Sequence, residues 1–160
     1  MSKLLSTFTC LLLLLCSFIA CKPSSKEVLQ YYVSGEVSRK HTEINGKKEG
    51  KMIDYYKDGK IKSERLFEND MQVGRSTYFY QSGNIKEVQY YEMGKMIGGD
   101  TIFYESGKIQ FLRNWNHGVL DGYIRKWDEN GVMNYEARYD NNKLVEVKGE
   151  SVHPDSLNVK

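Results

Sequence analysis

The stretch that decides the fold runs from Gly74 to Ile97 and reads GRSTYFYQSGNIKEVQYYEMGKMI. Its glycines Gly74 and Gly83 are nine residues apart, and the same pair recurs at intervals of 24 residues. A fixed period of this length indicates a repeat protein in which each copy stacks on its neighbours. The other pairs are Gly50 with Gly59, Gly98 with Gly107, and Gly122 with Gly131.

The turns of the repeat contain residue types that tolerate positive φ. A third series at the same interval substitutes only among Gly, Asp and Asn, which indicates turns rather than packing contacts. Segments such as Gln81-Ser82-Gly83-Asn84 follow aromatic residues and precede an aliphatic residue or Met, which is a β-hairpin signal. We therefore expect an all-β, antiparallel hairpin meander of about four to five repeats. The third series consists of Gly46, Asp70, Gly94, Gly118 and Asn142.

The spacing of apolar residues predicts the loop type and one core face. A three-residue loop with Gly59 in the left-handed region pairs Tyr55 with Ile61 and keeps odd-numbered residues on one face. At six-residue steps these positions alternate between aromatic residues and residues that are aliphatic or Met, so this face is predicted to be the core. The aromatic set is Tyr55, Phe67, Phe79, Tyr91, Phe103, Trp115, Trp127 and Tyr139; the other is Ile61, Val73, Ile85, Ile97, Ile109, Met133 and Val145, interrupted by Asp121.

The even-numbered positions form the candidate partner surface. Tyrosine and aliphatic residues would be neighbours there across adjacent strands, and such clusters are typical of protein interfaces. The alternative is that this face is the second side of a core. The candidate residues are Tyr56, Tyr78, Tyr80, Tyr90, Ile102, Tyr104 and Leu112.

The N-terminus has the features of an export signal. Lys3 precedes an apolar run from Phe8 to Ile19, which is shorter than the roughly 20 residues of a membrane-spanning helix. The run ends in Phe18-Ile19-Ala20-Cys21, which resembles the lipobox of bacterial lipoproteins. This resemblance implies that Cys21 is lipidated and becomes the first mature residue; a plain secretory signal is the alternative. Two or more acyl chains anchor a protein stably in a membrane.

These features predict the domain organisation. Residues 1–20 are a lipoprotein signal peptide, 21–30 a lipidated tether, 31–147 the repeat domain and 148–160 a polar tail. The protein would lie in the cell envelope, anchored on an extracytoplasmic side, with the membrane and leaflet left open. All three cysteines lie at or before Cys21, so the mature domain has neither disulfides nor thiolate ligands.

The repeat itself resembles a known family. The pattern Gly-x4-Tyr-Tyr-x2-Gly-Lys-Ile-x5-Phe runs from Gly50 to Phe67 and recurs from Gly74, Gly98 and Gly122. It is similar to the bacterial variant of the MORN repeat, often named antitoxin-like. The resemblance implies hairpins stacked into an elongated, twisted sheet and implies no reaction. The fourth copy departs from the pattern at Asp121 and Asp128.

Composition and motif searches point away from catalysis. The chain has 160 residues and a net charge of +2, which does not favour a nucleic-acid partner. His41, His117 and His153 have no partners at metal-ligand spacing, and no nucleophile–base pair or paired carboxylates stand out, so we expect no metal, cofactor or catalytic residue. The leading hypothesis is a non-enzymatic protein-interaction module; alternatives are an immunity or antitoxin-like protein and a structural component contacting lipid or peptidoglycan.

Overall fold

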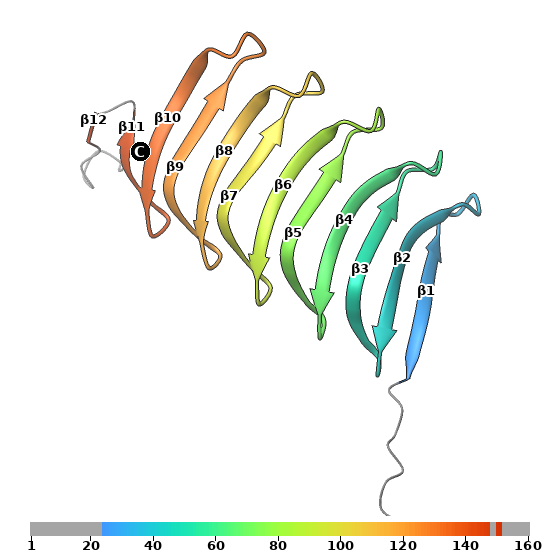
Figure 1. Ribbon diagram of the computed structural model, residues 1–160. Coiled ribbons are helices and arrows are strands. Elements are labelled where there is room, and N and C mark those ends of the chain that lie inside the picture. The colour runs from blue at the N-terminus through green and yellow to red at the C-terminus, as the bar shows by residue number, and fades with distance from the viewer. Residues whose placement is uncertain (1–23, 148–149, 152–160) are drawn as a thin grey trace, which may run out of the picture.

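The chain forms a single antiparallel sheet over the residues that the structure describes, which are 24–147 and 150–151 (Figure 1). In this computed structural model the order of strands in the sheet equals their order in the sequence, so the predicted all-β meander is confirmed. The strands are β1 Ser25–Tyr31, β2 Val37–Ile44, β3 Lys47–Tyr55, β4 Ile61–Glu68, β5 Met71–Phe79, β6 Ile85–Glu92, β7 Lys95–Phe103, β8 Ile109–Asn116, β9 Val119–Trp127, β10 Met133–Asp140, β11 Lys143–Val147 and β12 Glu150–Ser151.

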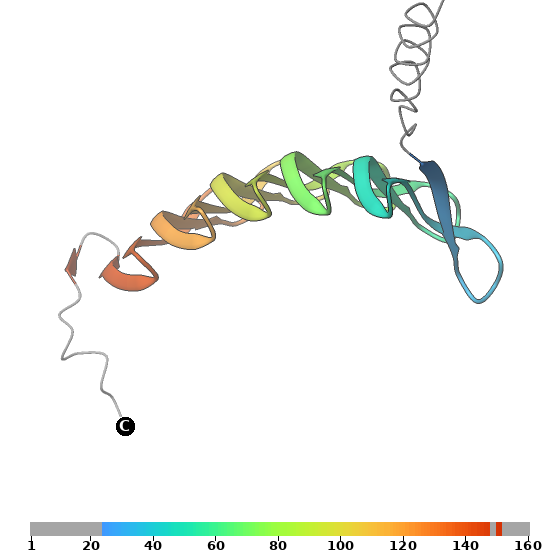
Figure 2. The same cartoon turned by 90° about the horizontal axis from the view of Figure 1, so that it is seen from below.

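The sheet is elongated and one layer thick. Figure 2 shows it from below as an arched ribbon, with successive hairpins side by side along its length. No second sheet or helix covers either face among the described residues. None of the described residues forms a helix long and apolar enough to cross a membrane.

Two kinds of turn alternate along the chain. At one edge, three-residue loops close with the Gly59 amide donating to the Tyr56 carbonyl and the Tyr56 amide donating to the Lys60 carbonyl. This loop pairs Tyr55 with Ile61, as the spacing predicts. The same two bonds recur in each of five loops in the described chain, at Tyr32, Tyr56, Tyr80, Tyr104 and Asp128.

The opposite edge has two-residue turns with positive φ at both central residues. Asn69 and Asp70, for example, have φ values of 49° and 68°. All five members of the third turn series have positive φ, as predicted from their residue types. These turns are also tied to the preceding hairpin, because the Asp70 amide donates to the Lys48 carbonyl and the Asp70 carboxylate accepts from the Lys48 amide at 2.9 Å.

The prediction of one odd-numbered core face is wrong. A two-residue turn pairs Glu68 with Met71, which places an odd residue opposite an even one. The bulge after each three-residue loop has the same effect, since Asp54 pairs with Ser63 although Tyr55 pairs with Ile61. Each face therefore carries odd residues of one strand and even residues of the next.

Two neighbouring rows of paired residues define the two faces. The network face carries the row Asp54, Ser63, Tyr78, Glu87, Ile102 and Phe111. The open face carries the row Ile53, Glu64, Thr77, Val88, Thr101, Leu112, Arg125 and Glu136.

The predicted aromatic stripe is divided between the two faces. Phe79 follows Tyr78 directly and so belongs to the open face, whereas Tyr91 lies two positions after Gln89 on the network face. Every second aromatic residue of the stripe pairs with a glycine of the series Gly50, Gly74, Gly98 and Gly122. These aromatic residues are Phe67, Tyr91, Trp115 and Tyr139.

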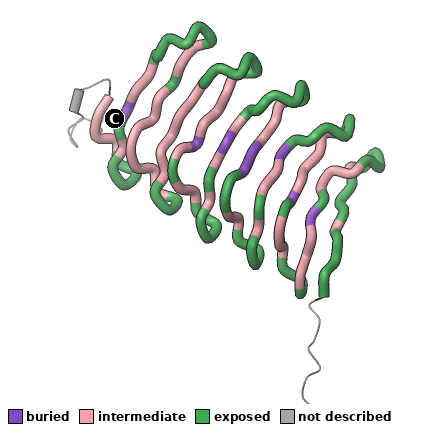
Figure 3. Tube along the Cα trace, in the orientation of Figure 1, coloured by how far each residue is buried: buried purple, intermediate pink, exposed green. Residues whose placement is uncertain are grey.

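Buried residues lie in the middle of the strands, whereas exposed residues concentrate at the turns of both edges (Figure 3). The network face holds most of the buried positions, among them Met52, Ser63, Ser76, Asp100 and Ala137. Thr77 and Val88 are the buried positions of the open-face row. The core is therefore a strip along the sheet rather than a layer between two sheets.

The N-terminal boundary of the sheet differs from the prediction. Residues 25–31, mostly assigned to the tether, form β1, in which Val28 pairs with His41. The Asn45 amide donates to the Ser24 carbonyl and fixes the start of this strand. The tether prediction is therefore wrong for β1, while the predicted signal peptide and Cys21 lie outside the described residues.

Candidate interaction surfaces

A ladder of tyrosine hydroxyls joins successive hairpins at the three-residue loops. The Tyr80 hydroxyl donates to the Phe103 carbonyl at 2.6 Å, and the Tyr104 hydroxyl donates to the Trp127 carbonyl at 2.8 Å. Tyr32 and Tyr56 make the equivalent bonds to Tyr55 and Phe79. Each hydroxyl donates to the carbonyl of the last residue of a strand, in β3, β5, β7 or β9. The role of these tyrosines in the described structure is thus to hold repeat to repeat.

Asp128 ends this ladder. It occupies the position that a tyrosine holds in the other repeats, and its carboxylate accepts from the Asn130 and Val132 amides at 2.9 Å each. Asp128 thus accepts hydrogen bonds from amides of its own loop, whereas the tyrosines at this position donate to the following hairpin. The departure noted in the sequence therefore marks the last unit of the tyrosine series.

The seven candidate partner residues do not share one face. Tyr56, Tyr80 and Tyr104 belong to the loop edge and the hydroxyl ladder. Tyr78 and Ile102 lie in the network-face row, whereas Leu112 lies in the open-face row. Tyr90 lies two positions after Val88 and so shares the open face with Leu112. The prediction that these residues are neighbours on a single surface is wrong, and their binding of a partner stays a prediction.

The network face carries an ion-pair cluster at its N-terminal end. Asp54 accepts hydrogen bonds from Arg39 at 2.5 Å and from Ser63 at 2.7 Å, and it also contacts Arg65. Burial alone would raise the pKa of Asp54, but the bonds from Arg39 and Ser63 and the charge of Arg65 lower it below its usual value. The guanidinium of Arg65 in turn lies over the Phe67 ring. This cluster has two cations for one anion.

A second cluster further along the same face has the opposite balance. One nitrogen of Arg113 contacts Asp100 and lies 3.7 Å from Glu87, while the guanidinium lies 5.5 Å and 5.7 Å from the centres of the Phe111 and Trp115 rings. The side chain of Asp100 is only 1% exposed. Burial raises the pKa of Glu87, and the neighbouring Asp100 charge raises it further. Two acidic groups therefore compete for one guanidinium.

The open face bears most of the exposed apolar side chains that the strands carry. Leu66 and Tyr90 are 39% and 43% exposed, and both lie on this face. Ile61, Ile85, Ile109 and Met133, which are 37% to 47% exposed, pair with the open-face residues Tyr55, Phe79, Phe103 and Trp127. Contiguous exposed apolar surface indicates an interaction site more often than scattered apolar residues do.

The apolar pairs produce a groove that repeats along the sheet. One hollow, of about 440 Å³, includes Val37, Tyr55 and Gly59 in its lining. Another, of about 290 Å³, includes Ile85, Phe103 and Gly107, which are the same positions two repeats later. The open face is therefore periodic in shape as well as in sequence.

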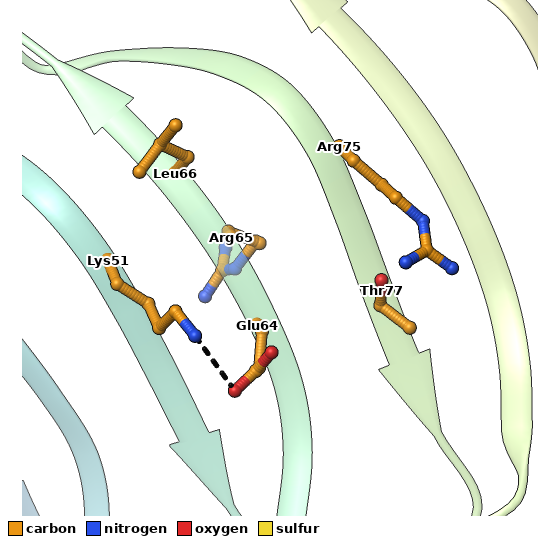
Figure 4. A pocket seen from close by; sticks show the side chains of 6 residues that line it. All are labelled: Lys51, Glu64, Arg65, Leu66, Arg75 and Thr77. Carbon is orange, nitrogen blue, oxygen red and sulfur yellow. Dashed lines mark hydrogen bonds and ion pairs between the residues drawn. The ribbon is translucent and has the colours of Figure 1, made fainter.

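A further hollow, of about 310 Å³, lies on the open face between β3 and β5, and Figure 4 shows the side chains that line it. The Lys51 ammonium lies 3.3 Å from the Glu64 carboxylate at its rim, and Leu66, Arg75 and Thr77 complete that side. Arg65 appears behind the β4 ribbon, which agrees with its place on the network face. The hollow is shallow and amphipathic rather than an enclosed ligand pocket.

The titratable residues of the described chain do not assemble into a metal site. Among residues 24–147, no group of three or more His, Asp or Glu side chains has the geometry to hold an ion. His117 lies in a two-residue turn, 3.0 Å from the exposed Glu92 carboxylate. His41 is buried in the network face and lies 3.3 Å from Glu43. His153 lies outside the described residues.

Three segments of the chain match the model of the MORN repeat variant, at residues 48–69, 72–93 and 120–141. The chain contains MORN-variant repeats. Each matched segment is one hairpin, namely β3–β4, β5–β6 or β9–β10. The hairpin β7–β8 lies between them and has the same loop bonds and tyrosine bond, so it is a further copy in structure. No curated protein matches the chain.

The MORN-variant repeats indicate a repeat protein that serves as a binding or structural module. The sequence reasoning missed the hydroxyl ladder and the open-face row. The ladder had a visible signal, since Tyr32, Tyr56, Tyr80 and Tyr104 recur every 24 residues directly before the loops. The open-face row had no such signal in the sequence, because its members can be identified only from the register of the paired strands.

Proposed function

We propose that this protein is a non-enzymatic, membrane-anchored module that binds another protein at the bacterial cell envelope. The observation that carries the proposal is the concentration of exposed apolar side chains on the open face, which no other element of the described chain covers. Burying such side chains against a partner is favourable by about 25 cal/mol per Å² of apolar surface. The anchor rests on the resemblance of the segment ending at Cys21 to a lipobox.

The binding part is tested by cross-linking in intact cells. The variant Ile85→Asp with Ile109→Asp places two carboxylates in the apolar groove and should remove the cross-linked proteins. Lys126→Asp, on the network side of β9, is the matched control and should retain them. Circular dichroism checks that each variant stays folded. Unchanged cross-linking by a folded double variant would refute the open face as the binding surface.

The anchor is tested separately. Cys21→Ser should abolish labelling by a fatty-acid analogue and release the protein from membranes. Continued membrane association of the unlabelled variant would contradict the lipid anchor. The identity of the cross-linked proteins separates a general interaction module from an immunity protein, because a toxin would be recovered in the second case.

A further inference from the structure

We propose that the open face binds a second copy of this chain, face to face and with the two sheets running in opposite directions. This inference deepens the proposed function by naming the partner that the open-face row binds. It rests on the order of side chains in that row and on the size of the face.

Between Glu64 and Arg125, the open-face row has one charged residue at each end and uncharged residues between them. At the N-terminal end, Glu64 on β4 pairs with Lys51 of β3 at 3.3 Å. At the C-terminal end, Arg125 on β9 pairs with Glu136 of β10 at 2.5 Å. Thr77, Val88, Thr101 and Leu112 lie between these ends, one on each strand from β5 to β8.

A two-fold axis between β6 and β7 makes this order self-complementary. The rotation places β4 of one copy against β9 of the other, so Glu64 faces Arg125. It likewise places β3 against β10, so the row residue Ile53 faces Glu136, with Lys51 two positions further along the same strand. At the centre, Val88 faces Thr101 and Thr77 faces Leu112. An interface of this kind is isologous, with every contact made twice.

The charged groups at the two ends are held in place within each copy. Arg125 lies 4.5 Å from the centre of the Tyr123 ring and is bonded to Glu136, while Glu64 is bonded to Lys51. The side chains of Glu64 and Arg125 are 34% and 35% exposed, so both still reach solvent. Such pre-ordered charges lose little conformational freedom on binding.

The face is large enough for a stable dimer. Strands of about eight residues rise about 3.3 Å per residue and lie about 4.8 Å apart, so the part from β3 to β10 covers on the order of 1,000 Å². A specific interface buries about 800 Å² per partner. The repeating grooves also favour a second copy, because the grooves of that copy have the same period of two strands. Stacked sheets pack about 10 Å apart.

The test uses two differently tagged full-length copies expressed together. Capture of one wild-type copy should retain the other. Glu64→Arg in both copies should abolish retention, because the introduced arginine would face Arg125, and Arg125→Glu in both copies should do the same. A copy with Glu64→Arg and a copy with Arg125→Glu should bind each other. In one half of that interface the two introduced residues face each other with opposite charge, and in the other half the unchanged Arg125 faces the unchanged Glu64. Lys126→Glu in both copies is the control and should leave retention unchanged.

Each contrary result has a defined meaning. Absence of retention between wild-type copies overturns the second copy as the partner. Retention that survives either single charge reversal, or failure of the two reversed copies to pair better than either variant pairs with itself, overturns the two-fold arrangement; circular dichroism establishes that the variants are folded. If cross-linked proteins still depend on Ile85 and Ile109 while copies do not associate, the proposed function stands and only this inference fails.

Discussion

The Tyr80 hydroxyl lies 2.6 Å from the backbone carbonyl of Phe103, one hairpin further along the sheet. This bond and its three equivalents connect residues 23 positions apart, so they act between repeats rather than within them. They add to the main-chain pairing that joins neighbouring strands. The stability of the sheet should therefore depend on single phenolic oxygens.

Replacing Tyr80 by Phe should lower the free energy of unfolding by about 0.5 to 1.5 kcal/mol, because the Phe103 carbonyl loses its donor while the ring is kept. Urea unfolding followed by circular dichroism measures the change. Tyr90→Phe is the matched control, since Tyr90 is 43% exposed and lies outside the ladder. Equal effects of the two substitutions would contradict a special role of the ladder.

Replacing Met93 by Asn should stabilise the protein by up to about 1 kcal/mol. Met93 has φ of 46°, and L-residues other than Asn and Asp pay about 1 to 2 kcal/mol there. The other two-residue turns have Asn or His at this position, namely Asn45, Asn69, His117 and Asn141. Thermal unfolding measures the gain, and Asn69→Met should produce a loss of similar size. A stabilising Asn69→Met would refute the argument.

Replacing Gly122 by Ala should be more damaging than replacing Gly98 by Ala. Both glycines have positive φ, but a Cβ at Gly122 would lie 2.9 Å from the Asn114 Cβ, whereas a Cβ at Gly98 meets nothing within 4 Å. Gly98→Ala should cost about 1 to 2 kcal/mol from its φ alone. Denaturant unfolding compares the two variants directly, and an equal cost would show that the Asn114 contact is relieved without penalty.

The Glu87 cluster should make stability depend on pH. Because burial and Asp100 raise the folded-state pKa of Glu87, the folded chain binds more protons than the unfolded chain above the usual value of 4.5. Stability should therefore fall as pH rises through that window. Unfolding measured across this range should show the fall in the wild type and a flatter profile for Glu87→Gln. An unchanged profile in Glu87→Gln would assign the dependence elsewhere.

Asp54 should act in the opposite direction. Its folded-state pKa lies below the usual value of 3.8, so it contributes stability above that pH and loses it as pH falls through the folded-state pKa. Asp54→Asn should therefore be destabilised at neutral pH, where Arg39 and Arg65 lose their anionic partner. A variant as stable as the wild type at neutral pH would contradict this.

The sequence predicted the strands, the loop type and the positive φ of the turn residues, because each depends on a few neighbouring residues. It did not predict which face a side chain occupies. That depends on counting residues through two turn types, and the bulge beyond Ile61 changes the count by one. The assumption of one parity therefore placed Phe79 and Tyr91 together, although they lie on opposite faces.

The sequence also did not predict β1, since residues 25–30 lack the repeat signature although they pair with β2. The two ion clusters were equally hidden. Arg113 and Asp100 have no special spacing in the sequence and meet because β7 pairs with β8.

The sheet order has a mechanical consequence. Each strand is hydrogen-bonded only to strands that precede or follow it directly in the chain. A pulling force applied to the two ends would therefore peel hairpins from an end one after another, rather than shear the whole sheet at once. Each hairpin would release roughly 80 Å of extended chain. Under tension the protein would lengthen in regular steps and shed load gradually, as an extensible strap does.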